Sequence, residues 1–254
     1  MASSIEFPTW RLYLNALMFW VGLIISTLLF APFSILLYPF PQGFKYRFIT
    51  QWAHFNIFWL GLTCRIRYRV EGKENIPDGA AIALCKHQST WETLALQRIL
   101  PQQAWVLKRE LLLIPFFGWG LAMLSPIAIN RSAGRKAVEQ LVDKGREKLD
   151  AGEWVVIFPE GTRVRPGDKK RYKLGGAVLA SQVDYPIIPV AHNAGELWPK
   201  GNFIKYPGDI TVVIGEPIHA LGREPTDINE EVGAWIDAQM QRISRPELWK
   251  RLEK

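Results

Sequence analysis

Residues 80–100 read AAIALCKHQSTWETLALQRIL, and this stretch decides the fold. Its first part, Ala80 to Cys85, is a short continuous apolar run, which is typical of a strand that is buried on both faces. Its last part, Ser89 to Leu100, has the apolar spacing of a helix. The stretch therefore predicts a strand, a loop that carries His87, and a helix.

Strands and helices alternate through the rest of the chain as well. The pattern predicts strands at 66–70, 104–107, 127–129, 154–158, 187–191 and 210–214, and helices at 111–124, 134–149, 174–183 and about 226–243. This alternation favours an α/β fold, a layered domain with a largely parallel central sheet flanked by helices. Loops at the strand ends of such a sheet carry function.

The N-terminal part has a different character. Between Arg11 and Lys45 there is no charged side chain, and residues 17–37 read LMFWVGLIISTLLFAPFSILL, which is long enough as a helix to cross a bilayer. A second apolar, aromatic stretch runs from 44 to 62, and strict alternation begins after Cys64. We therefore expect an N-terminal membrane-associated helical segment over 1–63 and a catalytic domain over 64–254.

Three arrangements of the N-terminal segment remain open. The first stretch spans the bilayer, or both stretches form a bent helical hairpin in one leaflet, or the first is a buried helix of a soluble protein. Pro32 and Pro39 are expected to interrupt the first stretch. In either membrane arrangement, Lys and Arg are far more frequent after Lys45 than before it, which predicts the cytoplasmic membrane with the catalytic domain facing the cytoplasm.

The charge of the chain limits the classes of possible binding partner but does not identify one of them. The net charge is +7 and the pI is about 9.4, which favours nucleic acid, an anionic membrane or phosphorylated substrates such as coenzyme A. Nucleic acid is the weakest of these, because the positive charge lies beside membrane-type segments and no nucleic-acid-binding motif is visible. Cys64 and Cys85 form neither a C-x-x-C pair nor a cluster with histidine, so we expect no metal site and no disulfide framework.

His87 is the first candidate for chemistry, because it follows a buried strand directly. Glu92 comes five residues later, where its carboxylate can turn back, accept the Nδ1 proton of His87 and fix the tautomer of the ring. Such a dyad suits a reaction in which the acceptor's own hydroxyl attacks a thioester. Ser89-x-x-Glu92 is equally a capping box, in which Glu92 binds the backbone of Ser89 instead. Ser89 lacks the G-x-S-x-G context of a serine nucleophile.

The second candidate is the segment FPEGTR at 158–163, which follows another apolar strand and precedes a basic loop. The guanidinium of Arg163 can bind a phosphate with two parallel hydrogen bonds, and Gly161 permits close approach of the backbone. The alternative interpretation of these residues is an ordinary turn followed by a solvated basic loop. Arg131, after the strand at 127–129, is a further candidate cation for the same pocket.

Together, these blocks resemble the 1-acylglycerol-3-phosphate acyltransferase family, whose members carry H-x-x-x-x-D, an arginine-bearing second block, F-P-E-G-T-R and a proline-bearing fourth block. The resemblance runs from about Tyr68 to Ile214. It assigns roles as follows: His87 and Glu92 as the catalytic pair, Arg131, Glu160, Gly161, Thr162 and Arg163 as the site of the acceptor's phosphate, and Pro189 as the fourth block. Three positions depart from the family pattern, namely Lys86 for asparagine, Glu92 for aspartate and Val164 for serine.

The resemblance implies a reaction and its partners. An acyl chain passes from acyl-CoA or acyl-carrier protein to the 2-hydroxyl of lysophosphatidic acid and gives phosphatidic acid, without a cofactor, a metal or a covalent enzyme intermediate. The lipid bilayer is then a partner and nucleic acid is not. Two alternatives stay open: an acyltransferase acting on glycerol-3-phosphate or another lysolipid, and a non-catalytic protein that docks on anionic membranes.

Overall fold

The computed structural model describes residues 9–245, without the side chain of Arg131. Within that part of the chain, seven strands form one sheet in the order β1-β7-β6-β2-β5-β3-β4. The strands are β1 (Ile66–Glu71), β2 (Ile82–Cys85), β3 (Gln103–Lys108), β4 (Ile127–Ile129), β5 (Trp154–Ile157), β6 (Ile187–His192) and β7 (Gly208–Ile214). All neighbours pair in parallel except β6 and β7, which are antiparallel. The predicted α/β fold is confirmed.

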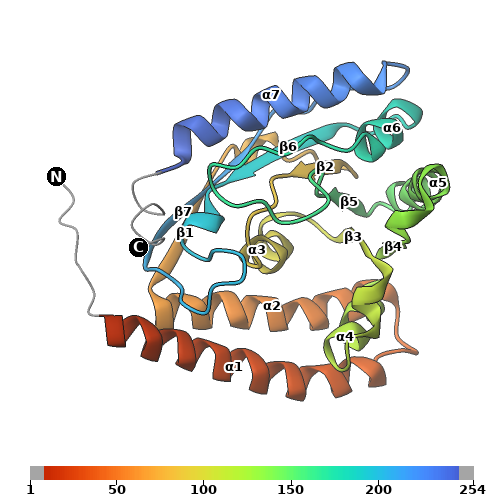
Figure 1. Cartoon of the computed structure of the whole chain (residues 1–254). Helices are drawn as coiled ribbons and strands as arrows, with labels where there is room; N and C mark the ends of the chain where they lie inside the picture. Colours follow the sequence, from red (N-terminus) through yellow and green to blue (C-terminus); the bar gives the residue numbers. More distant parts are fainter. Residues whose placement is uncertain (1–8, 246–254) are drawn as a thin grey trace.

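Helices cover both faces of the sheet (Figure 1). On one side lie α1 (Thr9–Leu36), α2 (Gln42–Cys64) and α3 (Trp91–Ile99), and on the other lie α5 (Arg135–Asp150), α6 (Gly175–Gln182) and α7 (Pro225–Ile243). A short helix, α4 (Phe117–Met123), contacts α1. Four 3₁₀ turns complete the described elements: η1 (Lys73–Asn75), η2 (Arg109–Leu113), η3 (Arg131–Ala133) and η4 (Ala194–Glu196).

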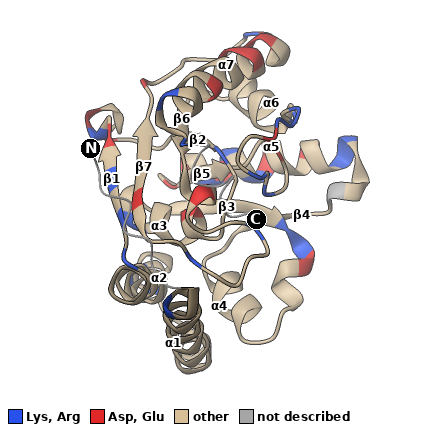
Figure 2. Ribbon diagram, turned by 60° about the vertical axis from the view of Figure 1, so that its left-hand side comes forward, with Lys and Arg blue, Asp and Glu red and all other residues tan. Residues whose placement is uncertain are grey.

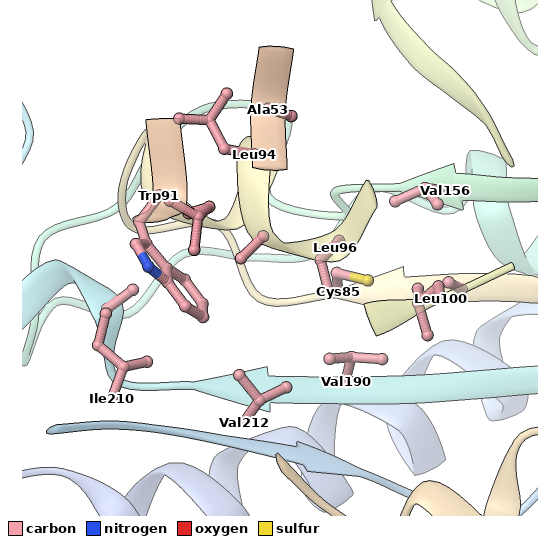
Figure 3. Packing of buried hydrophobic residues seen from close by; sticks show 14 of the residues in the cluster. Ala53, Cys85, Trp91, Leu94, Leu96, Leu100, Val156, Val190, Ile210 and Val212 are labelled. Carbon is pink, nitrogen blue, oxygen red and sulfur yellow. The ribbon is translucent and has the colours of Figure 1, made fainter. Parts of the chain in front are cut away.

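The short strand β2 shows why the sheet has a core on each side. Successive side chains of a strand point to opposite faces, so Ala83 and Cys85 pack towards α3, while Ile82 and Leu84 pack towards the opposite set of helices. Figure 3 shows the first of these cores, with the indole of Trp91 beside the strands of the sheet. An apolar run without alternation is what two buried faces require.

Pro115 divides the helix predicted at 111–124 into two elements. Residues 109–113 form the turn η2, and α4 begins only at Phe117. Pro115 disfavours helical backbone at the residue before it, and Ile114 is extended with φ −71° and ψ 118°. Gly118 then permits a close approach, because a Cβ there would lie 2.3 Å from the carbonyl oxygen of Leu112.

The two N-terminal helices run side by side along one flank of the domain (Figure 1). Pro32 lies inside α1 and does not interrupt it, contrary to the prediction, while α1 ends at Leu36, before Pro39. Proline removes one backbone hydrogen bond of a helix, and α1 remains helical on both sides of Pro32 despite that loss. Among the described helices, α1 is long and apolar enough to cross a membrane by length and composition.

The boundary predicted between 63 and 64 falls at the end of α2. Arg65 adopts left-handed backbone with φ 55° and ends that helix before β1 begins at Ile66. Leu60 of α2 and Phe19 of α1 share one core with the sheet. The division into two domains therefore stays a prediction, since the helices and the sheet are packed through common residues.

Candidate active site

His87 lies in the turn between β2 and α3, at the carboxyl end of a central strand. Its Nδ1 is 2.8 Å from Oε1 of Glu92. Its ring stacks on Phe158, with ring centroids 3.9 Å apart and planes 12° apart. The backbone N–H of Val164 donates to the carbonyl oxygen of His87 at 2.8 Å. The imidazole is therefore held by Glu92 and Phe158, the backbone of His87 is held by Val164, and Nε2 is the ring nitrogen left to exchange a proton with a substrate.

Glu92 performs both functions that the sequence left open. Besides meeting His87, its Oε1 accepts the backbone N–H groups of Gln88 and Ser89, each at 2.8 Å. The helix itself begins at Trp91, whose N–H donates to the Ser89 hydroxyl at 3.1 Å. One carboxylate thus closes the turn and contacts the imidazole, so the capping bond and the contact with His87 are not alternatives here.

The charge of Glu92 is stabilised although its side chain is fully buried. Burial alone would raise the pKa of this carboxyl, but the neighbouring imidazoles of His192 and His87 and the N–H of Ser89 outweigh it, so the pKa lies below its usual value. A carboxylate that stays ionised can stabilise the imidazolium that forms when His87 takes a proton.

A second histidine, His192, lies behind Glu92. It ends β6, is fully buried, and places Nε2 3.9 Å from Oε2 of Glu92. The N–H of Ala194 donates to Nδ1 at 3.3 Å, so Nε2 carries the proton that it gives to the carbonyl oxygen of Lys86 at 2.8 Å. Burial lowers the pKa of His192, and the nearby carboxylate of Glu92 opposes that effect. The sequence shows only that this histidine follows a buried strand; the pairing of β6 with β2, the strand that precedes His87, brings it to the site.

Glu160 is placed differently from the other residues of its motif. It is fully buried and does not line the cavity described below; its Oε1 meets the ammonium of Lys86 at 2.8 Å and the N–H of His87 at 3.4 Å. Its contact with a phosphate is not supported by this position. Instead, the buried pair of Lys86 and Glu160 joins the turn after β2 to the turn after β5.

Gly161, Thr162 and Arg163 do line the cavity beside His87. Gly161 has φ +69°, a backbone conformation that favours glycine, whereas an added Cβ would meet only the flexible end of the Lys173 side chain. Nη1 of Arg163 donates to the Thr90 hydroxyl at 2.7 Å. The guanidinium is thereby held next to the turn that carries the imidazole.

Arg131 is the predicted site residue that the structure leaves undecided. Its backbone lies in η3, directly after β4 at the far edge of the sheet, and its side chain lies outside the described atoms. Its contact with a phosphate stays a prediction.

An apolar cavity of about 360 Å³ opens beside these residues. The helices α1 and α2 contribute Phe30, Ala31 and Trp52, and the sheet contributes Trp105 of β3. Further walls come from α3, η2 and α4. His87, Arg163 and Lys200 line the cavity near one another, since Arg163 donates to Thr90 of the turn that follows His87 and Lys200 donates to the carbonyl oxygen of Arg163. Lys108 is a further cation on the lining. The cavity therefore suits an amphipathic molecule with a long apolar chain and an anionic or reactive polar end.

His87 is the candidate general base of this arrangement. No group of three or more His, Cys, Asp or Glu that could hold a metal is present among the residues that the structure describes. Ser89 is buried and donates its hydroxyl proton to the carbonyl oxygen of Trp198 at 2.7 Å, which leaves it unsuited to attack a substrate. The chemistry that fits is base-assisted attack by a hydroxyl group that the substrate itself brings.

Comparisons with known proteins agree with this geometry. The acyltransferase family model matches residues 67–193. A 1-acyl-sn-glycerol-3-phosphate acyltransferase of Pseudomonas aeruginosa is 43% identical over 92% of this chain and 96% of its own length. The chloroplastic enzyme LPAT1 of Arabidopsis thaliana, with the same descriptive name, is 28% identical over 78% of this chain, which spans 55% of the plant protein.

A solved structure shares the fold. The crystal structure of the 1-acyl-sn-glycerophosphate (LPA) acyltransferase PlsC from Thermotoga maritima superposes with a TM-score of 0.74, at 24% identity, over 90% of this chain and 94% of that one. The cavity beside the His87–Glu92 pair fits the chemistry of these relatives. On the match to the family model and to the Pseudomonas relative, the chain belongs to the acyltransferase family that includes these 1-acyl-sn-glycerol-3-phosphate acyltransferases.

Proposed function

We propose that this protein transfers an acyl chain from a thioester to the 2-hydroxyl of lysophosphatidic acid and so makes phosphatidic acid for phospholipid synthesis. The observation that carries the proposal is the His87–Glu92 pair, 2.8 Å apart, at the polar end of an apolar cavity beside Arg163. The substrate named for the Pseudomonas relative, which is 43% identical over nearly its whole length, supports the choice of acceptor.

In the proposed mechanism His87 acts as general base. Its Nε2 takes the proton of the acceptor's hydroxyl as the oxygen attacks the thioester carbon, and Glu92 stabilises the imidazolium through Nδ1. When the carbon–sulfur bond breaks, the same proton passes to the leaving sulfur and gives a free thiol. The thioester is already activated, so the proposal includes no cofactor, no metal and no covalent enzyme intermediate. Proton transfer of this kind contributes roughly 10² to 10⁴ in rate.

The polar and apolar parts of the cavity lining suggest where each part of the substrates binds. The acyl chain lies among the aromatic side chains of the cavity, and the acceptor's phosphate lies at Arg163, with the backbone of Gly161 and the side chain of Thr162 beside it. A guanidinium binds phosphate with paired hydrogen bonds, which fixes the acceptor's orientation as well as its affinity. Arg131 is the second cation proposed for this phosphate.

The N-terminal helices are proposed to bring the site to a lipid bilayer. Much of the outer surface of α1 is apolar and exposed, including Leu17, Ile24 and Phe33. The opposite side of α1 packs along α2 and, through Phe19 and Trp20, against Trp198. A helix attached along its length to the domain favours insertion into one leaflet over spanning. We place the protein at the cytoplasmic membrane with the catalytic domain facing the cytoplasm.

The test is an assay with purified protein, lysophosphatidic acid in lipid vesicles and a labelled acyl thioester. We expect labelled phosphatidic acid from the wild type, loss of transfer in His87→Ala, and normal transfer in His219→Ala, which removes an exposed histidine. Glycerol-3-phosphate and other lysolipids are offered in parallel. Product from one of these alone would replace the acceptor, no transfer to any acceptor would favour a membrane-docking protein, and retained turnover in His87→Ala would refute the mechanism.

A further inference from the structure

His192 is a buried titratable side chain that the proposed mechanism has not used. It ends β6, and none of its surface is exposed. A buried imidazole is stable when both ring nitrogens have hydrogen-bond partners. Both have one here: the N–H of Ala194 donates to Nδ1 at 3.3 Å, and Nε2 donates to the carbonyl oxygen of Lys86 at 2.8 Å. The ring of His192 is therefore held in one tautomer and one orientation.

The backbone of Lys86, the residue before His87, is attached to β6 through both of its polar groups. Its N–H donates to the carbonyl oxygen of Val190 at 2.9 Å, and its carbonyl oxygen accepts the Nε2 proton of His192. The first contact continues the pairing of β2 with β6, whereas the second depends on a side chain. Replacing this one side chain therefore releases the carbonyl end of Lys86, from which the chain runs directly into His87.

The same Nε2–H group of His192 lies near the carboxylate of Glu92. Oε1 of Glu92 meets the imidazole of His87, and Oε2 lies 3.9 Å from Nε2 of His192. This second distance is too long for a hydrogen bond, so the interaction is between the polar N–H group and the charge of the carboxylate. Glu92 and His192 are both fully buried, so water screens the interaction little. Glu92 thus has an imidazole beside each of its two oxygens.

Resting on the proposed function, we infer that His192 is a positioning residue for the acyl transfer. It holds the backbone before His87 and the second oxygen of Glu92, and so keeps Nε2 of His87 aimed at the acceptor's hydroxyl. His192 does not line the apolar cavity, so it acts on the rate of proton transfer and not on substrate binding. The position of the base matters, because a misplacement of about 1 Å can lower a rate by about 10²-fold.

Two amide substitutions separate the hydrogen-bond donor of His192 from the rest of the ring. The amide nitrogen of His192→Gln can take the place of Nε2 and still donate to Lys86, whereas the shorter amide of His192→Asn can replace only Nδ1. We expect kcat to fall about tenfold or more in His192→Asn and to stay within about threefold of the wild type in His192→Gln. The KM values for both substrates stay unchanged. The matched control is His54→Asn, the same change at a half-buried histidine of α2, and it keeps the wild-type kcat.

A spectroscopic measurement tests the positioning without any substrate. The Nδ1 proton of His87, hydrogen-bonded to Glu92, gives a low-field proton resonance that His87→Ala removes. We expect this resonance to keep its position in His192→Gln. In His192→Asn it moves to higher field, because the hydrogen bond from His87 to Glu92 lengthens when the turn is released.

Kinetics are measured below the thermal unfolding midpoint of each variant, so that loss of folded protein does not enter kcat. The inference is overturned if His192→Asn keeps the wild-type kcat, if His192→Gln loses as much as His192→Asn, if the KM values rise in place of a fall in kcat, or if the resonance is unchanged in His192→Asn. A His192→Asn protein that folds at no temperature also overturns it, because His192 is then needed for folding itself. Failure of the proposed function looks different: the wild type makes no phosphatidic acid, while the resonance still tests the positioning of His87.

Discussion

At the scale of single residues, the carboxylate of Glu92 holds the site together, because it binds the side chain of His87 and the backbone of the turn at once. Oε1 of Glu92 receives the imidazole of His87 and two backbone N–H groups, all at 2.8 Å. The longer glutamate side chain, where related sequences have aspartate, reaches all of them from the first turn of α3. The departure from the family pattern therefore leaves the pair intact, and the same residue shapes the turn and orients the base.

Glu92→Gln separates these two contributions. A glutamine oxygen can still accept the N–H groups of Gln88 and Ser89, so we expect the thermal unfolding midpoint to change little. The amide carries no charge to stabilise the imidazolium of His87, and we expect kcat to fall by roughly 10² or more. Steady-state kinetics together with thermal unfolding check both parts. An unchanged kcat would show that Glu92 serves only to cap the helix.

At the scale of elements, a buried ion pair connects two strands that are adjacent in the sheet but far apart in the sequence. Lys86 follows β2 and Glu160 follows β5, and their side chains are 7% and 0% exposed. The second oxygen of Glu160 has no hydrogen-bond partner among the described residues. The carboxylate thus depends on Lys86 and on the N–H of His87, and both loops of the site depend on this pair.

Lys86→Met should leave Glu160 buried without its cation and lower the free energy of unfolding by about 3–5 kcal/mol. Adding Glu160→Gln to the same protein removes the uncompensated charge and should restore most of that loss. The control is Lys148→Met, which breaks a longer and more exposed pair, 3.6 Å from Glu153. Urea denaturation of the three variants measures the difference. Equal losses of unfolding free energy in Lys86→Met and Lys148→Met would contradict the dependence of both loops on the Lys86–Glu160 pair.

At the scale of the whole molecule, the protein has one apolar flank and a charged remainder. Figure 2 shows α1 almost free of charged side chains, and Arg11 is the only charged residue in that helix. Exposed apolar side chains continue from α1 and α2 onto η2 and α4, with Leu113 79% exposed and Trp119 41% exposed. The same helices contribute to the lining of the apolar cavity. In the proposed membrane orientation, a lipid would therefore reach His87 from the bilayer along this flank.

Two matched substitutions test this flank. Ile24 on α1 and Leu221 before α7 are each 55% exposed. Ile24→Glu should weaken binding to lipid vesicles about tenfold or more, because burying one such side chain contributes roughly 1.5–3 kcal/mol. Leu221→Glu should bind vesicles as the wild type does. Flotation with vesicles gives the measurement, and equal binding by the two variants would place the membrane contact elsewhere.

The sequence by itself determined the order of strands and helices, the position of His87 and the family. These follow from local periodicity and from motifs, which need only neighbouring residues. It also predicted that Glu92 lies close enough to reach His87, because five residues across a turn into a helix bring the two together. The local pattern failed where α1 continues through Pro32, since the outcome there depends on what packs around the helix.

Only the tertiary structure decided which groups meet across the sheet. The parallel pairing of β2 with β5 and with β6 brings Glu160 to Lys86 and His192 to Glu92, although 74 and 100 residues separate the members of each pair in the sequence. The cavity likewise needs walls from α1, α2 and β3 at once. The register of the strands and the packing of the helices depend on burying surfaces that are far apart in the chain. A local sequence pattern does not show which of these surfaces pack together.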